Sequence, residues 1–415
     1  MGTVPLLWDF GGLLRHLSTR LSFSQAASGS ISGVFTPFFG AFLAYRGLSP
    51  DQIGLVLSLS LVLRAFSGPL SGILADARND RRAVMLFLYW VALTGFSALC
   101  LVGSPLLIAI FAVPAYLAYG AATPLLESVS VRLAERYGFD YGRVRIWAST
   151  AFVVMNVVGG VFAKIFGLGV IAPLLAAGAA VAVLSTVMLP SPPSVTVDAA
   201  PLSRRLKATL GETRELLRSR VFLIFLAAAS FVQATHAFYY GYGGLHWKAI
   251  GYSAMLIGII WPLGVLGEIA LFSVALKVQA AFTPARLLLI GGAICVVRWT
   301  ILAFDPPFPL VVFAQFLHGG TFALGHLGAV FFILKAVPQR LAATAQSLYF
   351  VCSQGVLMGI MTMASGAVYA SWQGRAYLLM SACGVMAMIF AVLLSKRWHG
   401  ERIIAGDEDE IVDTI

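Results

Sequence analysis

Charged residues are scarce in this chain. Asp, Glu, Lys and Arg make up 11% of its 415 residues, and hydrophobic residues make up 59%. An ordinary soluble domain carries roughly 25% charged residues. A soluble fold of this length could not cover its own surface with so few charges. The composition therefore excludes a soluble globular protein and predicts a membrane protein.

Sequence signals for metal or nucleotide chemistry are also missing. The four cysteines are scattered without metal-ligand spacing, and we expect buried free thiols: Cys100, Cys295, Cys352 and Cys383. The sequence contains no phosphate loop, nucleotide-binding cassette or nucleophile elbow. We therefore expect neither an enzyme nor a cofactor, and any transport would draw its energy from a proton gradient. The net charge of +10 reflects basic loops, and we expect no nucleic-acid partner.

The sequence contains instead twelve apolar stretches of about 20 residues, each long enough to cross a bilayer as a helix. They run over 21–45, 53–75, 83–102, 106–133, 144–166, 170–189, 221–245, 254–276, 287–304, 310–334, 342–370 and 375–395. The predicted fold class is an all-α multi-pass membrane protein, with twelve transmembrane helices in two six-helix bundles.

Basic residues accumulate in alternate connections between these stretches. The polar segment around 204–220 and the connection after residue 75 are rich in Arg. The opposite connections carry only four basic residues: Arg46, Lys164, Lys248 and Arg375. Since cytoplasmic loops carry an excess of Lys and Arg, we expect both termini in the cytoplasm. We expect the chain in the lipid bilayer of a bacterial inner membrane, as a monomer.

The polar segment 190–220 divides the chain into four predicted parts. It begins with PSPPSVTVDAAP and continues with SRRLKATLGETRELLRSR, whose leucines form one stripe among basic residues. Such a segment is typical of an amphipathic helix on a membrane surface. We predict an N-terminal bundle at 1–189, a cytoplasmic central loop at 190–220, a C-terminal bundle at 221–395 and a cytoplasmic acidic tail at 396–415. This layout is typical of paired bundles that rock around a midplane site.

Two glutamates and three arginines lie where the chain is otherwise almost purely apolar: Glu127, Glu268, Arg64, Arg145 and Arg298. A charge inside a bilayer costs roughly 2.5 to 3.5 kcal/mol on insertion scales. Such residues persist where they face a polar cavity, pair with one another, or carry a substrate or proton. This pattern predicts a transport protein that binds a small molecule.

The candidate substrate-binding residues fall into two groups. Arginine binds carboxylates bidentately, so Glu127 and Arg145 either hold a substrate or form a structural ion pair. Arg64 has no acid nearby in sequence, and it either attracts an anionic substrate or pairs with Glu127 or Glu268.

The second group comes from the segment QATHAFYYGY. Helical spacing aims Gln233, His236 and Tyr240 at roughly one face, which suits a polar aromatic solute. The alternative is an aromatic belt at the outer membrane interface, which the nearby Tyr242 and Trp247 would extend.

The candidate proton-coupling residues are Glu268, His318 and Arg298. Burial favours the neutral form of a carboxyl, as a proton-coupling group requires, and the alternative for Glu268 is a permanent pair with Arg298. Histidine titrates near physiological pH, so His318 is predicted to relay protons or, alternatively, to be a hydrogen-bonded structural histidine.

The connection after residue 72 reads GILADARNDRR and resembles the cytoplasmic signature of the major facilitator superfamily, G-x-L-A-D followed by basic residues. Asn79 and Asp80 depart from that pattern. An Asp at one helix end that faces Arg on a neighbour forms a charge clamp that breaks and re-forms during transport. We therefore predict a gating role for Asp76, Arg81 and Arg82, with an ordinary solvated turn as the alternative.

Longer segments resemble the lactose-permease-like branch of this superfamily, and within it the phenylpropionate permease family. The segment ESVSVRLAERYGFDYGRVRIW resembles the permease segment with a substrate-binding glutamate and arginine, here Glu127 and Arg145. GVLGEIALF, ICVVRWTIL and AQFLHGGTFALG match the segments that imply Glu268, Arg298 and His318. THAFYYGYGGLHW is a phenylpropionate-type feature.

Three departures separate this chain from the sugar permeases of that branch. Phe152 stands where they have a sugar-stacking tryptophan, and Gln315 and Thr321 replace a lysine and a glutamate beside the histidine. The resemblance thus implies a proton symporter that imports an aromatic monocarboxylate by alternating access. The alternatives are a sugar or nucleoside permease, a metabolite or drug exporter, and a non-transporting membrane sensor on the same scaffold.

Overall fold

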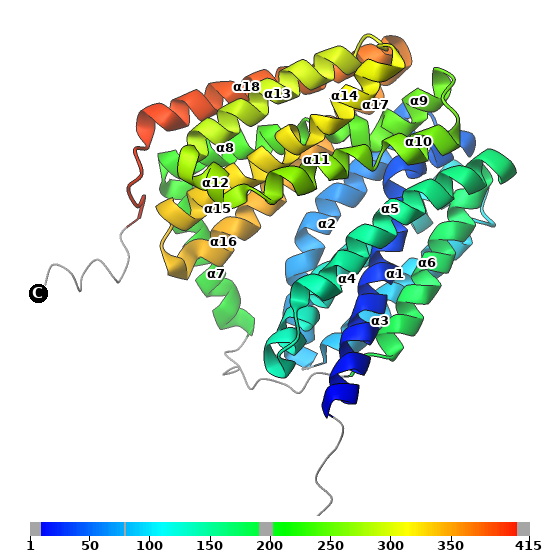
Figure 1. Cartoon of the computed structure of the whole chain (residues 1–415), viewed down its shortest axis with the longest axis horizontal. Coiled ribbons are helices and arrows are strands. Elements are labelled where there is room, and N and C mark those ends of the chain that lie inside the picture. The colour runs from blue at the N-terminus through cyan, green and yellow to red at the C-terminus, as the bar shows by residue number, and fades with distance from the viewer. Residues whose placement is uncertain (1–9, 79, 191–201, 405–415) are drawn as a thin grey trace, which may run out of the picture. The chain divides into compact units, whose positions relative to one another are not determined.

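The computed structural model describes residues 10–78, 80–190 and 202–404, and every regular element within them is a helix. The chain forms two compact units (Figure 1). Unit 1 comprises Met1–Phe42 and Ser67–Thr196, and unit 2 comprises Leu43–Phe66 and Val197–Ile415. The all-helical class is therefore confirmed, while the predicted domain boundaries at 189, 220 and 395 stay a prediction.

Unit 1 is built from long helices with polar caps. They are α1 (Phe10–Tyr45), α2 (Pro50–Arg78, whose second part belongs here), α3 (Arg81–Ala98), α4 (Pro105–Tyr137), α5 (Tyr141–Phe166) and α6 (Ile171–Val187). Asp80 and Ser104 accept hydrogen bonds from the first turns of α3 and α4. Gly138 ends α4 with a φ of 70°, a conformation that favours glycine.

Two glycines on α1 allow its backbone to touch α5. A Cβ at Gly29 would fall 2.1 Å from the carbonyl oxygen of Ala148, and one at Gly33 would fall 2.6 Å from that of Phe152. Small residues spaced four apart on a membrane helix permit this close approach. The contact fixes α5, which carries Arg145, against α1.

Unit 2 contains shorter helices separated by turns. They are α7 (Leu202–Arg218), α8 (Arg220–Ala234), α9 (Gly244–Ala249), α10 (Ala254–Ile260), α11 (Leu263–Phe272), α12 (Ala275–Ala281), α13 (Pro284–Leu302), α14 (Phe308–Phe316), α15 (Leu324–Ala336), α16 (Gln339–Phe350), α17 (Met358–Trp372) and α18 (Tyr377–Arg397). Helix α13 packs lengthwise on α18 (Figure 1). Three π-helical turns interrupt the unit: Tyr239–Gly243, Gly319–Ala323 and Val351–Leu357.

Ten helical segments of the described chain are long and apolar enough to cross a membrane. Helix α3, on which the predicted stretch 83–102 begins, is not among them. The last segment, Gln339–Arg397, has 59 residues and covers two predicted stretches. A straight helix of that length would span about 90 Å, three times a bilayer core, but it is divided at Gln373, where φ is 47°. The count of twelve spans stays a prediction.

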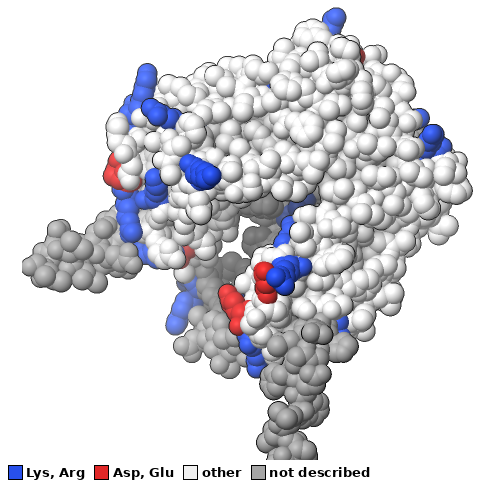
Figure 2. Space-filling view, in the orientation of Figure 1, with Lys and Arg blue, Asp and Glu red and all other residues white. Residues whose placement is uncertain are grey.

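Charged side chains avoid the middle of the helices on the surface in view. Figure 2 shows a surface almost free of Lys, Arg, Asp and Glu over α13 and α14, with charged residues near helix ends. Many large apolar side chains are exposed, including Leu276 at 82% and Phe304 at 63%. Such a surface suits contact with lipid.

Helix α7 confirms the helix predicted in the polar segment, and it packs on α16. Leu216 is fully buried, Arg340 donates to both carboxylate oxygens of Glu215 at 2.9 and 2.5 Å, and Thr344 hydrogen-bonds Glu212. Its predicted position on the membrane surface stays a prediction. Residues 191–201 and the acidic stretch 405–415 lie outside the described residues.

Candidate functional site

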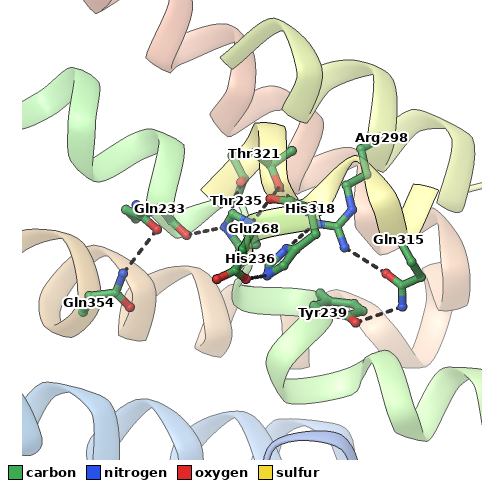
Figure 3. A network of polar contacts seen from close by, with 10 residues as sticks. All are labelled: Gln233, Thr235, His236, Tyr239, Glu268, Arg298, Gln315, His318, Thr321 and Gln354. Carbon is green, nitrogen blue, oxygen red and sulfur yellow. Dashed lines mark hydrogen bonds and ion pairs between the residues drawn. The ribbon is translucent and has the colours of Figure 1, made fainter. Parts of the chain in front are cut away.

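A polar network lies inside unit 2, centred on the fully buried Arg298 of α13. Figure 3 shows its ten members, named here the Arg298 network: Gln233, Thr235, His236, Tyr239, Glu268, Arg298, Gln315, His318, Thr321 and Gln354. One terminal nitrogen of Arg298, Nη1, donates to His318 Nδ1 at 2.7 Å and to Thr321 Oγ1 at 3.0 Å. The other, Nη2, donates to Gln315 Oε1 at 3.0 Å. The guanidinium also lies 4.2 Å from the ring centroid of Trp299, a favourable cation–π distance.

Glu268 of α11 joins this network through His318. Its Oε1 lies 2.8 Å from His318 Nε2, and the Glu268 side chain is 20% exposed against 7% for His318. The structure thus brings together the three predicted proton-coupling residues, Glu268, His318 and Arg298. The direct partner of Glu268 is His318, so the alternative of a direct pair with Arg298 is not what the structure shows.

Glycines let α11 approach close enough for this contact. A Cβ at Gly264 would lie 3.0 to 3.1 Å from three atoms of His318, and a Cβ at Gly319 would lie 2.3 Å from the carbonyl oxygen of Gly267. A larger residue at these positions would push α11 away from the π turn that follows His318. The Glu268–His318 bond therefore depends on backbone contact between two elements.

His236 forms a second branch of the network. Its Nε2 lies 3.1 Å from Thr321 Oγ1 and its Nδ1 lies 3.0 Å from the carbonyl oxygen of Gln233. The Tyr240 ring stacks on His236 with centroids 5.6 Å apart, as the predicted common face requires. The alternative of an interfacial aromatic belt is not supported, because Tyr242 and Trp247 are 0% and 2% exposed.

Neutral polar residues that the sequence did not single out as site residues extend both branches. Gln315 Nε2 donates to Tyr239 Oη at 2.9 Å. Gln233 Nε2 donates to Tyr349 Oη at 3.2 Å, and Gln354 Nε2 donates to Gln233 Oε1 at 3.3 Å. Gln315 and Thr321 were visible in the sequence only as departures from sugar permeases. Their position on either side of His318 in an apolar stretch was the available signal.

All three π turns of unit 2 contribute to the network. Tyr239 lies in the first turn, Thr321 in the second, directly after His318, and Gln354 in the third. Isolated π turns within helices are frequent at functional sites. This coincidence supports a functional role for the Arg298 network.

Unit 1 holds a second ionic site, formed by α4 and α5. Arg145 Nε lies 2.7 Å from Glu127 Oε1, with side chains 44% and 28% exposed. Tyr141 Oη donates to Glu127 Oε2 at 2.5 Å, and Gln25 Nε2 donates to the same oxygen at 3.3 Å. The structure thus pairs Glu127 with Arg145 and adds two donors that the sequence did not indicate. Whether the pair contacts substrate stays a prediction.

Arg64 and the predicted gating residues lie elsewhere. Arg64 is half-buried on α2 and has an interaction partner, and its predicted contact with an anionic substrate stays a prediction. Arg81 donates to Ser128 Oγ at 2.7 Å, and Arg82 donates to the carbonyl oxygen of Val187 at 2.5 Å, at the end of α6. The side chain of Asp76 lies outside the described residues, so its predicted charge clamp stays a prediction.

A further histidine–carboxylate pair of unit 2 links α9 to the connection between α13 and α14. His246 Nε2 lies 2.7 Å from Asp305 Oδ1, and Tyr369 Oη lies 3.4 Å from His246 Nδ1. A Cβ at Gly374 would lie 2.7 Å from His246 Nε2. Among the described residues, no group of three or more His, Cys, Asp or Glu side chains has the arrangement of a metal site.

Comparison with known proteins agrees with this architecture. The chain matches the MFS_1 like family over residues 27–380. It is 30% identical to the "Probable 3-phenylpropionic acid transporter" of Escherichia coli (strain K12), covering 86% of this chain and 92% of that protein. It is 28% identical to the "Maltose permease" of Geobacillus stearothermophilus, covering 88% and 91%.

Solved structures share the fold. The D323A mutant of the nucleoside transporter NupG superposes with a TM-score of 0.80 at 18% identity, covering 92% of this chain and 100% of that chain. A D-xylose–proton symporter gives 0.69 at 14% identity, covering 94% and 99%. The chain therefore belongs to the MFS_1 like family, a family of major facilitator superfamily transporters.

Proposed function

We propose that the protein is a proton symporter that imports a small organic solute by alternating access, and that the solute is an aromatic monocarboxylate of the phenylpropionate kind. The observation that carries the proposal is the Glu268–His318–Arg298 chain of contacts. Buried ionisable groups joined in this way are typical of proton relays in membrane transporters. Protonation at the Glu268–His318 pair permits solute binding, and the proton and solute leave together in the cytoplasm.

Recognition of a carboxylate is assigned to Arg145. Its side chain is 44% exposed and engages Glu127 through Nε, and arginine suits bidentate carboxylate binding. Arg298, by contrast, is fully buried and donates to three acceptors. Phe35 and Tyr116 of the same unit stack with centroids 4.2 Å apart, which supports an aromatic face for the solute. Tyr240 and Arg64 are proposed as further substrate contacts. Gln233 and His236 are as fully buried as Arg298, and their predicted contact with the solute stays a prediction.

A neutral sugar or nucleoside is the second candidate. The amides of Gln233 and Gln354 and the hydroxyl of Tyr349 form a neutral hydrogen-bonding group in unit 2, which suits hydroxyl-rich solutes. A maltose permease is among the relatives.

The proposal of a proton symporter also includes its topology and location. We propose twelve spans with both termini in the cytoplasm, a monomer in the bacterial inner membrane, and a gating role for Asp76, Arg81 and Arg82.

A thermal-shift screen of purified protein at two pH values tests the substrate class. A ligand that binds only the folded state raises the stability of a protein. Because protonation at the Glu268–His318 pair is proposed to permit solute binding, we expect 3-phenylpropionate to stabilise the protein more at the lower pH. Arg145→Gln should abolish the shift, whereas Arg132→Gln, at an exposed arginine of the same region, should retain it. Stabilisation by maltose or uridine alone would favour the second candidate. Stabilisation by none of the three at either pH would contradict both.

A further inference from the structure

The two ring nitrogens of His318 face partners of opposite kind. Nδ1 lies 2.7 Å from Arg298 Nη1, and Nε2 lies 2.8 Å from Glu268 Oε1. A guanidinium can only donate hydrogen bonds, so Nδ1 is the acceptor and carries no proton. The single proton of the neutral ring then resides on Nε2 and is donated to Glu268.

We propose that Arg298 locks His318 in the neutral Nε2–H tautomer, so that His318 is a positioning residue and Glu268 alone takes up the coupling proton. The inference rests on the proposed proton symport, and it assigns the transported proton to the carboxyl group of Glu268. A proton added to Nδ1 would bring two N–H groups face to face at 2.7 Å. His318 could be protonated only if Arg298 moved away.

Arg298 is held too firmly to move easily. Besides His318, it donates to Thr321 at 3.0 Å and to Gln315 at 3.0 Å. Its guanidinium packs 4.2 Å from the Trp299 ring centroid and 5.1 Å from that of Tyr239. Displacing it would leave several buried polar groups without partners, and such groups are costly in a protein interior.

A second histidine, His236, is fully buried, and its ring centroid lies 5.0 Å from that of His318. Its Nδ1 faces the carbonyl oxygen of Gln233 at 3.0 Å, which can only accept, so Nδ1 carries the proton. Its Nε2 lies 3.1 Å from Thr321 Oγ1, which accepts from Arg298 Nη1 at 3.0 Å and can donate its single proton either to that nitrogen or to the carbonyl oxygen of His318 at 3.1 Å. Arg298 therefore fixes the tautomer of His318 directly, whereas it reaches His236 only through Thr321.

Among Glu268, His318 and Arg298, only Glu268 can gain a proton without breaking a hydrogen bond. Oε1 accepts from His318 Nε2 whether or not Oε2 is protonated. Its side chain is also more exposed than that of His318, at 20% against 7%. The other ionisable groups near the Glu268–His318 pair are Tyr239 and Tyr240, whose ring centroids lie 6.1 and 6.3 Å from that of His318, and His326, which interacts electrostatically with Glu268. His326 is half-buried against the rings of Phe272 and Phe322, and it serves as the matched histidine control.

An amide substitution separates positioning from proton carriage. A glutamine side chain offers an acceptor oxygen to Arg298 and an NH2 donor to Glu268, but it takes up no proton near neutral pH. His318→Gln should therefore keep proton-coupled uptake of 3-phenylpropionate in proteoliposomes within about tenfold of the unmodified protein, as for exchange of one neutral hydrogen-bonding group for another. His318→Leu should lose this uptake, and Glu268→Gln should lose the proton movement. The control His326→Gln should keep the uptake and the proton movement. Loss of proton movement in His318→Gln with retained solute exchange would overturn the proposal.

A spectroscopic test needs no substrate. Nitrogen-15 NMR of histidine-labelled protein in lipid nanodiscs, with the His318 signals assigned by their loss in His318→Gln, reports the tautomer directly. We expect one protonated and one unprotonated ring nitrogen, with Nε2 protonated, unchanged between about pH 5 and pH 8, where a free imidazole titrates. An imidazolium or an Nδ1–H tautomer in the folded protein would overturn the lock. If the lock is found but 3-phenylpropionate moves no protons, the proposed function fails and the tautomer assignment stands.

Discussion

Arg298 is fully buried, and its direct hydrogen-bond partners are a histidine, a threonine and a glutamine. The ionisable members of this network were predictable from the sequence, because a charge in an apolar stretch is costly and therefore conspicuous. Gln315, Tyr349 and Gln354 were not, because an uncharged polar side chain is tolerated in many membrane helices. The hydrogen-bond partners in the network follow from contacts between helices, which residue type alone does not reveal.

Gln315→Leu should destabilise the protein by about 1 to 3 kcal/mol, because it leaves buried donor and acceptor groups without partners. The groups affected are Arg298 Nη2 and Tyr239 Oη. Thermal unfolding in detergent measures the effect. Gln354→Leu is the matched control and should cost less, since the Gln354 side chain is half-buried and its bond to Gln233 is 3.3 Å long. Equal stability of Gln315→Leu and the unmodified protein would refute this role of Gln315.

At the scale of elements, helical regions were predictable and their interruptions were not. Apolar stretches marked the positions of most long helices, but periodicity does not reveal the π turns at Tyr239–Gly243, Gly319–Ala323 and Val351–Leu357. One of these turns, Gly319–Ala323, packs closely on α11 through Gly319 and Gly267. The amphipathic helix α7 was predicted, but its ion pair with α16 depends on residues 125 positions apart.

Gly374→Ala should break the His246–Asp305 pair. The new Cβ would lie 2.7 Å from His246 Nε2 and 2.8 Å from Asp305 Oδ1, and overpacking of this kind costs about 1 to 3 kcal/mol. Asp305 already adopts a φ of 47°, which leaves little freedom to relax. A lower thermal midpoint is expected, whereas Gly103→Ala, which meets nothing within 4 Å, should be neutral. An unchanged midpoint in Gly374→Ala would show that the connection adapts.

The contact between α7 and α16 should weaken in acid. The hydrogen bond to Arg340 holds the pKa of Glu215 below its ordinary value of 4.5. Because the folded-state pKa is depressed, the pair stabilises the protein above that ordinary value, and the stabilisation is lost as pH falls through the lowered pKa.

The effect should be under about 1 kcal/mol, since both side chains are more than a third exposed. Protection factors of α7 amides from hydrogen exchange measure it, and Glu215→Gln should remove the pH dependence. Protection of the unmodified α7 that stays constant through this acid range would contradict the assignment.

At the scale of the whole molecule, the compact units do not coincide with the two halves of the sequence. Residues 43–66 belong to unit 2, because the first part of α2 packs on elements near the end of the chain. A Cβ at Gly355 would lie 2.2 Å from Ala65 Cβ, and one at Gly366 would lie 3.2 Å from Gly54 Cα. Contacts between residues about 300 positions apart leave no periodic signal in a single sequence.

Cysteine labelling tests the predicted topology at its least certain helix, α3. In a background without the four native cysteines, Asp80→Cys and Gly103→Cys flank α3. If α3 crosses the membrane, an impermeant maleimide added to intact cells should label only Gly103→Cys, and Asp80→Cys should react after permeabilisation. Labelling of both positions from one side would exclude twelve spans with the proposed orientation.

The most direct test of the mechanism is to measure whether the variant Glu268→Gln still moves protons with the solute. The pH of a weakly buffered suspension of cells is recorded while 3-phenylpropionate is added under anaerobic conditions. We predict that the unmodified protein makes the medium alkaline as protons enter with the solute. Glu268→Gln should abolish this change while it retains exchange of labelled for unlabelled solute. Alkalinisation of unchanged size in Glu268→Gln would contradict the assignment of the coupling proton to this carboxyl.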